Sequence, residues 1–293
     1  MSAYIGGMGY AFRIINVFTV DGDRLSGNPL CVFEDARGLT DGQMQALARQ
    51  MNLSETTFVL PATVAGADAR VRIFTPGFEM PFAGHPTLGT ASVVAGLGDG
   101  APRAAVALEM QAGLVAVTGD GATWTLRAAR APVTREVEAS RAELASMVGL
   151  PADAILDRPL WVDTGVEQLV IPIASPALVR AARPDAALLE RFGMCPSRGE
   201  AMAYLWARGE PAWTVRFLFT LDGGAVEDPA TGSACANLGG WMIATGQPLP
   251  LTASLRQGDA VQRRSRLGLR VDDAGAIFVT GEVSELGRGV IEL

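Results

Sequence analysis

The chain has a single histidine, His85, and only three cysteines, Cys31, Cys195 and Cys235. The cysteines are far apart, odd in number and without the short spacing of metal ligands. Neither a disulfide framework nor a zinc site is therefore expected. The sequence instead indicates buried free thiols and no metal site.

Long apolar runs and an excess of positive charge are also missing. No apolar stretch approaches the roughly 20 residues that cross a bilayer, and the first residues lack the charged and then apolar layout of a signal peptide. We therefore expect a cytoplasmic protein without a membrane partner. The net charge is −7, which leaves no basic stripe to neutralise phosphates and argues against a nucleic-acid partner.

What the chain does contain is a repeated segment. A strand at Arg72–Thr75 precedes Pro81–Ala91, and a similar strand at Arg216–Thr220 precedes Glu227–Ala234. The two copies lie half a chain apart, which indicates duplication. At 293 residues the chain also exceeds the usual size of a single core.

Each copy continues into a helix that is small or apolar on nearly every face, at Pro86–Leu97 and at Ser233–Thr245. A helix of this kind must be buried, and a pair of strands follows each one. We therefore expect an α+β fold with two pseudo-symmetric domains, each a curved sheet or barrel around a central helix.

The predicted domains are 1–128, completed by a C-terminal strand at 283–293, and 129–282. Residues 129–140 have no apolar period and are expected to form the crossing between the halves. Further helices are predicted from capping signals at Thr40, Ser140, Ser175 and Asp185. Strands are expected near 11–20, 29–34, 56–60, 69–75, 104–110, 113–118, 122–128, 166–173, 201–207, 213–220, 266–271 and 276–282.

The turns ahead of the two apolar helices are candidate binding elements. Gly84 and His85 open one helix, and Gly232 and Ser233 open the other. The start of a helix carries partial positive charge and unpaired N–H donors, so two such turns meeting between the halves are expected to hold a carboxylate. The alternative for either turn alone is ordinary capping.

Three side chains are candidates for chemistry. Glu55 lies where a helix has ended and a buried strand begins, so it is either a base in a cleft or a surface glutamate. Asp228 precedes a proline-led turn and is either a substrate contact or a cap for backbone N–H groups. His85 is either functional or a structural histidine, and its place at a helix start favours the neutral form.

These segments resemble the PhzF-like family, which comprises phenazine-biosynthesis-type isomerases with the diaminopimelate epimerase fold. The match runs in order from about residue 11 to residue 293. The strings that carry it are Gly27-Asn28-Pro29-Leu30, Met44-Gln45, Asn52-Leu53-Ser54-Glu55-Thr56-Thr57-Phe58-Val59, Arg72-Ile73-Phe74-Thr75-Pro76, Glu79-Met80-Pro81-Phe82-Ala83-Gly84-His85-Pro86-Thr87-Leu88-Gly89, Glu227-Asp228-Pro229-Ala230-Thr231-Gly232-Ser233-Ala234 and Gly287-Arg288-Gly289.

The resemblance implies a cofactor-independent isomerase, usually a homodimer, that shifts a proton on a small carboxylate-bearing substrate. Glu55 resembles the family's general acid/base, and His85 and Asp228 resemble its catalytic partners. The turns at Gly84 and at Gly232-Ser233 resemble its substrate contacts. The type member moves a proton in a dihydro-hydroxyanthranilate, giving an enol that becomes a ketone.

Departures from the family pattern leave the substrate open. Gln168 stands where many members have histidine, and Val261–Arg266 replaces the usual Gly-Arg-Pro-Ser pattern. A two-thiol racemase or epimerase is disfavoured because Ala83 and Ala230 stand where cysteines would be needed. A non-catalytic binding protein on the same fold stays an alternative. A dinucleotide enzyme is a weaker one, because Gly84–Gly98 lacks the spaced glycines and the following acidic residue.

Overall fold

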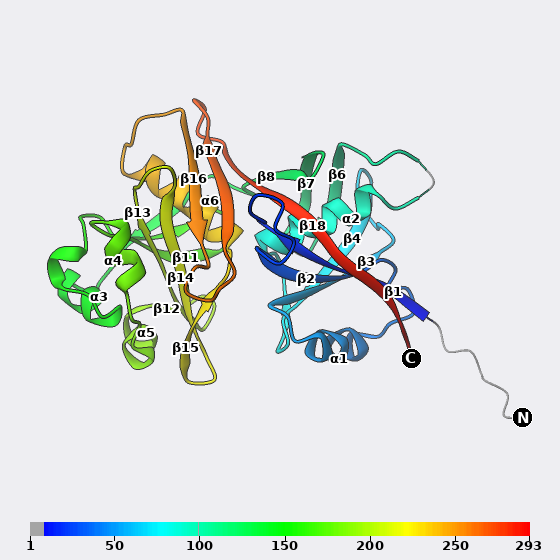
Figure 1. Ribbon diagram of the computed structural model, residues 1–293, viewed down its shortest axis with the longest axis horizontal. Helices are drawn as coiled ribbons and strands as arrows, with labels where there is room; N and C mark the ends of the chain where they lie inside the picture. Colours follow the sequence, from blue (N-terminus) through cyan, green and yellow to red (C-terminus); the bar gives the residue numbers. More distant parts are fainter. Residues whose placement is uncertain (1–8, 99) are drawn as a thin grey trace, which may run out of the picture. The chain divides into compact units, whose positions relative to one another are not determined.

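The computed structural model describes residues 9–98 and 100–293. The described chain is a mixed α+β structure with two compact units (Figure 1). Unit 1 comprises the described residues up to Val17, together with Pro29–Trp124 and Val283–Leu293, and unit 2 comprises Phe18–Asn28 and Thr125–Glu282. Residues 1–8 and 99 of the predicted first domain lie outside the described residues. Within the described ranges, no helix is long and apolar enough to span a bilayer.

The sheet of unit 1 closes on itself. Its strands bond in the order β1, β2, β3, β4, β6, β7, β8 and β18, and β18 bonds β1 again. The pairs β2–β3 and β4–β6 are parallel. The bounds are β1 (Gly9–Val17), β2 (Asn28–Phe33), β3 (Glu55–Leu60), β4 (Ala69–Phe74), β5 (Glu79–Met80), β6 (Ala105–Met110), β7 (Gly113–Asp120), β8 (Thr123–Arg127) and β18 (Ile277–Glu292).

Helix α2 (Gly84–Ala95) is the central helix of this closed sheet, as the apolar sequence predicts. It packs against β1, β3, β4, β6 and β7, and its residues are buried apart from Ser92. Gly89 lets α2 lie close to β1 and β2, because a Cβ there would lie 2.7 Å from atoms of Ile15 and Leu30. The amphipathic helix α1 (Asp41–Met51) buries Met44, Leu47 and Ala48 and packs on β3 and β4.

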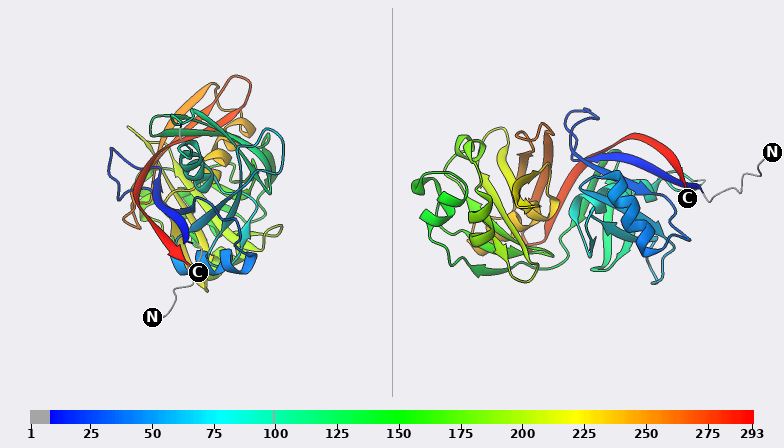
Figure 2. Two further views of the ribbon diagram at one scale, coloured as in Figure 1. Left: turned by 90° about the vertical axis from the view of Figure 1, so that its right-hand side faces the viewer. Right: turned by 90° about the horizontal axis from the view of Figure 1, so that it is seen from below.

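The last strand, β18, returns to the first, as predicted. It pairs antiparallel with β1 from Gly9↔Glu292 to Val17↔Val283, with an irregularity between Ile14 and Ile15. Figure 2 shows the two strands running side by side. The pairing joins the described N-terminal segment to residues at the other end of the sequence, so unit 1 is built from both.

Unit 2 contains a sheet with the order β9, β10, β11, β13, β14, β16, β17 and β18, in which β11–β13 and β14–β16 are the parallel pairs. The short strands β12 and β15 pair with β13 and β14. The bounds are β9 (Val133–Glu136), β10 (Leu160–Asp163), β11 (Glu167–Pro172), β12 (Met194–Cys195), β13 (Glu200–Ala207), β14 (Trp213–Leu221), β15 (Gly224–Asp228), β16 (Leu251–Gln257) and β17 (Ser265–Val271).

Helix α6 (Gly232–Ala244) is the buried helix of unit 2. It packs against β9, β10, β11 and β17, and Leu238 within it is fully buried, whereas Ile243 near its end is half-buried. Helices α4 (Pro176–Ala181) and α5 (Ala186–Phe192) pack on β13 and β14, and α3 (Arg141–Met147) packs on α5 and on the 3-10 turn η1 (Ala152–Ala154).

The predicted helix starts are confirmed. Thr40 with Gln43 and Ser140 with Glu143 form capping boxes, and Ser175 and Asp185 accept hydrogen bonds from backbone N–H groups of the helices that they open. Residues 129–140 contain one strand that was not predicted. Val133–Glu136 form β9, whose side chains are all exposed and therefore show no apolar alternation.

Candidate functional site

In unit 1, the structure brings together two of the predicted catalytic residues. Glu55 is the first residue of β3, and the preceding helix ends at Asn52 in the left-handed conformation, which turns the chain into the strand. His85 is the second residue of α2. Their side chains lie 3.3 Å apart, from Glu55 Oε2 to His85 Nε2, and both are largely buried. A carboxyl group and an imidazole are thus in position to exchange or share a proton.

His85 is neutral at physiological pH. Burial lowers the pKa of its imidazole to about 3, and a hydrogen bond with the backbone of Pro29 opposes this shift only in part. The neutral form was predicted from the place of His85 at a helix start, but burial is the larger cause.

The partners of His85 also determine which ring nitrogen carries its hydrogen. Proline has no N–H group, so the ring must donate to the carbonyl oxygen of Pro29. Because Nε2 faces Glu55, the donor to Pro29 is Nδ1–H. Nε2 of the neutral ring then presents a lone pair to the carboxyl group, and a proton on Glu55 can be held between the two.

In unit 2, Asp228 is the last residue of β15 and is held by two side chains. The Asn28 amide donates to Oδ1 at 2.9 Å, and the Thr231 hydroxyl donates to Oδ2 at 2.5 Å. Burial raises the pKa of the Asp228 carboxyl to about 6. The side chain therefore accepts bonds from an amide and a hydroxyl, whereas the capping alternative had suggested backbone N–H groups.

The turn between Asp228 and α6 is fixed by Gln257. Its amide donates to the Asp228 carbonyl at 2.9 Å and to the Thr231 hydroxyl at 3.0 Å, and its oxygen accepts the N–H of Thr231 at 3.2 Å. Neither Gln257 nor Asn28 was given a role from the sequence. No signal along the chain shows that Asn28 meets a turn 200 residues away.

The starts of α2 and α6 differ from those of the other α-helices in the described ranges. Ala83 and Thr231 precede these two helices, and neither side chain caps the helix that it precedes. The helices α1, α3, α4 and α5 all have a side-chain cap. No capping side chain therefore accepts a hydrogen bond from the first N–H groups of the helices that begin at Gly84 and Gly232, where the helix dipole is positive.

The residue next to Gly232 is Ser233, whose hydroxyl accepts a hydrogen bond from the Gln168 amide at 3.0 Å. Thr231, rather than Ala230, is the residue that directly precedes α6, so the position predicted for this turn is one residue too early. Neither Ala83 nor Thr231 is a thiol, and the two-thiol racemase stays disfavoured.

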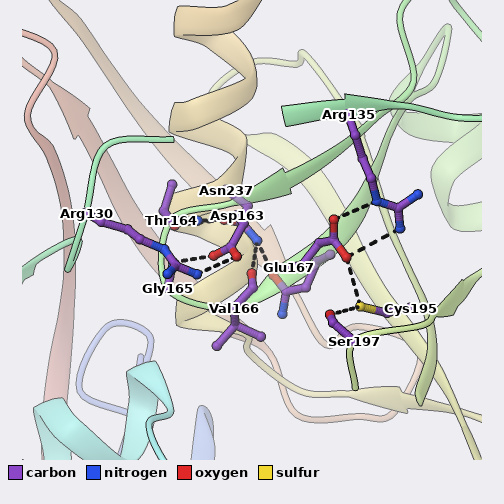
Figure 3. A network of polar contacts seen from close by, with 11 residues as sticks. Arg130, Arg135, Asp163, Thr164, Gly165, Val166, Glu167, Cys195, Ser197 and Asn237 are labelled. Carbon is purple, nitrogen blue, oxygen red and sulfur yellow. Dashed lines mark hydrogen bonds and ion pairs between the residues drawn. The ribbon is translucent and has the colours of Figure 1, made fainter. Parts of the chain in front are cut away.

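Figure 3 shows a second polar network in unit 2, around the hairpin of β10 and β11. Arg135 Nε donates to Glu167 Oε1 at 2.7 Å, and the Cys195 thiol donates to Glu167 Oε2 at 3.0 Å. Burial is the main cause that raises the pKa of Cys195. All three cysteines are free and buried, as predicted. Among the described side chains, no cluster of three or more histidine, cysteine, aspartate or glutamate residues could hold a metal ion.

Comparison with known proteins shows the family. The model of the phenazine biosynthesis-like protein family matches residues 15–286. An uncharacterised isomerase of Pasteurella multocida is 37% identical over 280 residues, which cover 96% of this chain and 93% of the relative. A trans-2,3-dihydro-3-hydroxyanthranilate isomerase of Pseudomonas aeruginosa is 34% identical over 288 residues, which cover 97% of this chain and 98% of that enzyme.

Solved structures show the same fold. A PhzF-family phenazine biosynthesis protein from Bacillus anthracis superposes with a TM-score of 0.82 at 22% identity, covering 98% of this chain and 100% of that one. A hydroxyproline epimerase from Agrobacterium vitis gives 0.64 at 15% identity, covering 97% and 91%. The fold is thus an epimerase-like α+β fold. Within this class, the chain belongs to the phenazine biosynthesis-like, or PhzF, family of isomerases.

Proposed function

We propose that this protein is a cofactor-independent isomerase that moves a proton between two carbons of a small carboxylate-bearing substrate, with Glu55 as the acid/base. The observation that carries the proposal is the buried pair of Glu55 and neutral His85, whose facing atoms are 3.3 Å apart. Among the relatives, the enzyme of Pseudomonas aeruginosa is named for the isomerisation of trans-2,3-dihydro-3-hydroxyanthranilate, and a compound of this class is the first substrate to test.

The proton shift needs one group that accepts and then returns a proton. Glu55 as a carboxylate takes the proton from a C–H bond next to a double bond, and the electron pair of that bond moves into the conjugated system. The protonated carboxyl group then returns the proton to the far carbon, which restores the charge of Glu55. Nε2 of His85 accepts a hydrogen bond from the protonated carboxyl and holds it between the two steps.

The uncapped helix starts supply donors for an anionic substrate. Gly84 and His85 begin α2, and Gly232 and Ser233 begin α6. A helix N-terminus carries about half a positive charge together with free N–H donors, and this favours a carboxylate. We assign Asp228 to the polarisation of a donor group on the substrate. The sharing of one ligand by both turns stays a prediction.

The proposed function is tested by hydrogen exchange into carbon. Purified protein is incubated in deuterium oxide with trans-2,3-dihydro-3-hydroxyanthranilate and a panel of cyclic and acyclic unsaturated amino and hydroxy acids, and carbon-bound deuterium is followed by mass spectrometry. We expect exchange with at least one carboxylate and none in the Glu55→Gln variant. Binding of panel members without any exchange would favour the alternative of a non-catalytic binding protein.

The duplication of the two halves is a second part of the proposal. In both units, parallel and antiparallel strand pairs alternate in the same order. In unit 1 the pairs are β2–β3 (parallel), β3–β4 (antiparallel), β4–β6 (parallel) and β6–β7 (antiparallel). In unit 2 they are β11–β13 (parallel), β13–β14 (antiparallel), β14–β16 (parallel) and β16–β17 (antiparallel).

Ion pairs at matching places support the duplication. Arg72 on β4 pairs with Glu79 on β5, and Arg216 on β14 pairs with Glu227 on β15. In each unit the glutamate lies five residues before the first residue of the buried helix, Gly84 or Gly232. The expected homodimer and the cytoplasmic location stay predictions.

A further inference from the structure

A chain of hydrogen bonds between buried amide groups leads to the Ser233 hydroxyl. Thr164 follows β10, Gln168 is the second residue of β11, and Asn237 lies in the middle of α6. All three side chains are buried. Figure 3 shows Thr164 and Asn237 side by side. An asparagine within an otherwise apolar helix needs partners for its amide, and it finds them in this chain.

The backbone fixes the orientation of Asn237. The N–H group of Thr164 can only donate, and it lies 2.9 Å from Oδ1 of Asn237, which must therefore accept. The Thr164 hydroxyl donates to the same oxygen at 2.7 Å. On the other side, Nδ2 of Asn237 donates to the Val166 carbonyl oxygen at 2.7 Å. If the Asn237 amide were flipped, its N–H would face the N–H of Thr164 and its oxygen would face the carbonyl oxygen of Val166.

The orientation of the Asn237 amide determines that of the Gln168 amide. Nδ2 of Asn237 donates to Gln168 Oε1 at 2.8 Å. The oxygen end of the Gln168 amide thus faces Asn237, and its nitrogen end faces Ser233, whose Oγ lies 3.0 Å from Nε2. Because Nε2 can only donate, the Ser233 oxygen is the acceptor. Its own hydrogen then points away from Gln168 and is available to a ligand.

We propose that Asn237 and Gln168 are positioning residues that set the Ser233 hydroxyl as a hydrogen-bond donor, so that the start of α6 selects an acceptor such as a carboxylate and disfavours a donor such as an ammonium group. This inference rests on the proposed function, because it assigns a role within the same site. A glutamine amide without this partner could turn either its oxygen or its nitrogen toward Ser233, whereas the amide held by Asn237 presents only a donor.

Neutron diffraction on a crystal exchanged into deuterium oxide tests the direction without any ligand. We expect deuterium on Gln168 Nε2 along the line to Ser233 Oγ, and the Ser233 deuteron directed away from Gln168. A Ser233 deuteron that points at Gln168 would show the opposite direction and overturn the proposal, whatever reaction the protein catalyses.

Binding measurements test the consequence for selectivity. The probes are 3-hydroxyanthranilate and 2-aminophenol, which share a substituted ring and differ by the carboxylate, and dissociation constants are measured by calorimetry. We expect the wild type to prefer 3-hydroxyanthranilate by at least tenfold, and Ser233→Ala to weaken its binding about tenfold, as loss of a hydrogen bond to a charged group does. Gln168→Met should weaken it several-fold without changing the affinity for 2-aminophenol.

The double variant separates positioning from general damage. If Gln168 acts through Ser233, Gln168→Met adds nothing in the Ser233→Ala background. The matched control is Gln45→Met, which removes an amide that donates to the carbonyl oxygens of Thr75 and Pro76 in unit 1, and it should leave both affinities unchanged.

The failures of the two proposals can be told apart. Additive effects of the two substitutions, or no preference of the wild type for the carboxylate, would overturn the positioning role even if deuterium exchange depends on Glu55. Conversely, a non-additive pair in a protein that catalyses no exchange would support the positioning role and contradict the isomerase.

Discussion

Glu55 and His85 are the residues at which charge and burial decide the chemistry. Their contact leaves one proton to be held between a carboxyl oxygen and Nε2. Glu55→Gln keeps the shape of the side chain but removes the proton acceptor. We expect turnover to fall by about 10²–10⁴-fold with little change in the free energy of unfolding, while the exposed control Glu138→Gln keeps full activity. Activity of Glu55→Gln within tenfold of the wild type would refute the assignment.

His85 is the only histidine in the chain, so its ring resonances are unambiguous. With a pKa of about 3, the imidazole should stay neutral between pH 5 and pH 8. A nitrogen-detected NMR titration should show constant shifts typical of a ring protonated at Nδ1. A midpoint near 6.5, the ordinary pKa of histidine, would contradict both the burial and the assignment of its hydrogen.

Asp228 has the opposite effect on stability to that of an ion-paired carboxylate. Its pKa is about 6 in the folded protein and 3.8 ordinarily, so folding disfavours the ionised form. The resulting destabilisation is absent below pH 4, grows as the pH rises and is complete above pH 6. Relative to the wild type, Asp228→Asn should gain about 1–3 kcal/mol in unfolding free energy between pH 4 and pH 7.5. Urea titrations at pH 4 and pH 7.5 measure the unfolding free energies of the wild type and the variant. The same difference between the two proteins at both pH values would exclude a raised pKa of Asp228.

Among the elements, α1 and α2 show how differently two helices of one unit use glycine. A Cβ at Gly89 in α2 would meet atoms of Ile15, Leu30 and Val17 within 2.9 Å, whereas at Gly42 in α1 it would meet nothing within 4 Å. We expect Gly89→Ala to lower the free energy of unfolding by about 1–3 kcal/mol through overpacking. Gly42→Ala should raise it by about 0.5–1 kcal/mol. Denaturant titration distinguishes the two, and a stabilising Gly89→Ala would show that α2 packs more loosely.

Helices and long strands could be predicted because their signals are local. The capping boxes at Thr40 and Ser140 need only residues three positions apart. The burial of α2 and α6 could be predicted from their apolar composition. The strands β9, β10, β15 and β16 were not predicted. β9 is exposed along its length, and β10 and β15 are short, so their own residues give little signal. β16 (Leu251–Gln257) does alternate between buried and more exposed residues, and the sequence analysis missed it all the same.

The candidate site shows the same division. Glu55, His85 and Asp228 were found through motifs that are continuous in sequence. The roles of Asn28, Asn237 and Gln257 depend on hydrogen bonds to residues far along the chain, which composition and period do not encode. In the sequence, Gln168 was identified only as a departure from the family pattern. The role proposed for it depends on the orientation of the Asn237 amide.

At the scale of the whole molecule, β18 is needed by unit 1 although it lies at the other end of the sequence. Deletion of 283–293 removes one of the two partners of β1, the other being β2. We expect amide hydrogen exchange to show loss of protection in β1–β4, with protection retained in β11, β13 and β14. As a control, the same residues placed ahead of Gly9 through a short turn should restore protection, because Glu292 pairs with Gly9 in an antiparallel register.

The discontinuous make-up of the two units also orders events during synthesis. Unit 2 has all of its residues once Glu282 has been added to the chain, whereas unit 1 still lacks Val283–Leu293. The unit that holds most of the early residues is therefore the last to be completed. Until then β1 exposes an unpaired edge, and nascent chains are expected to depend most on chaperones over this interval.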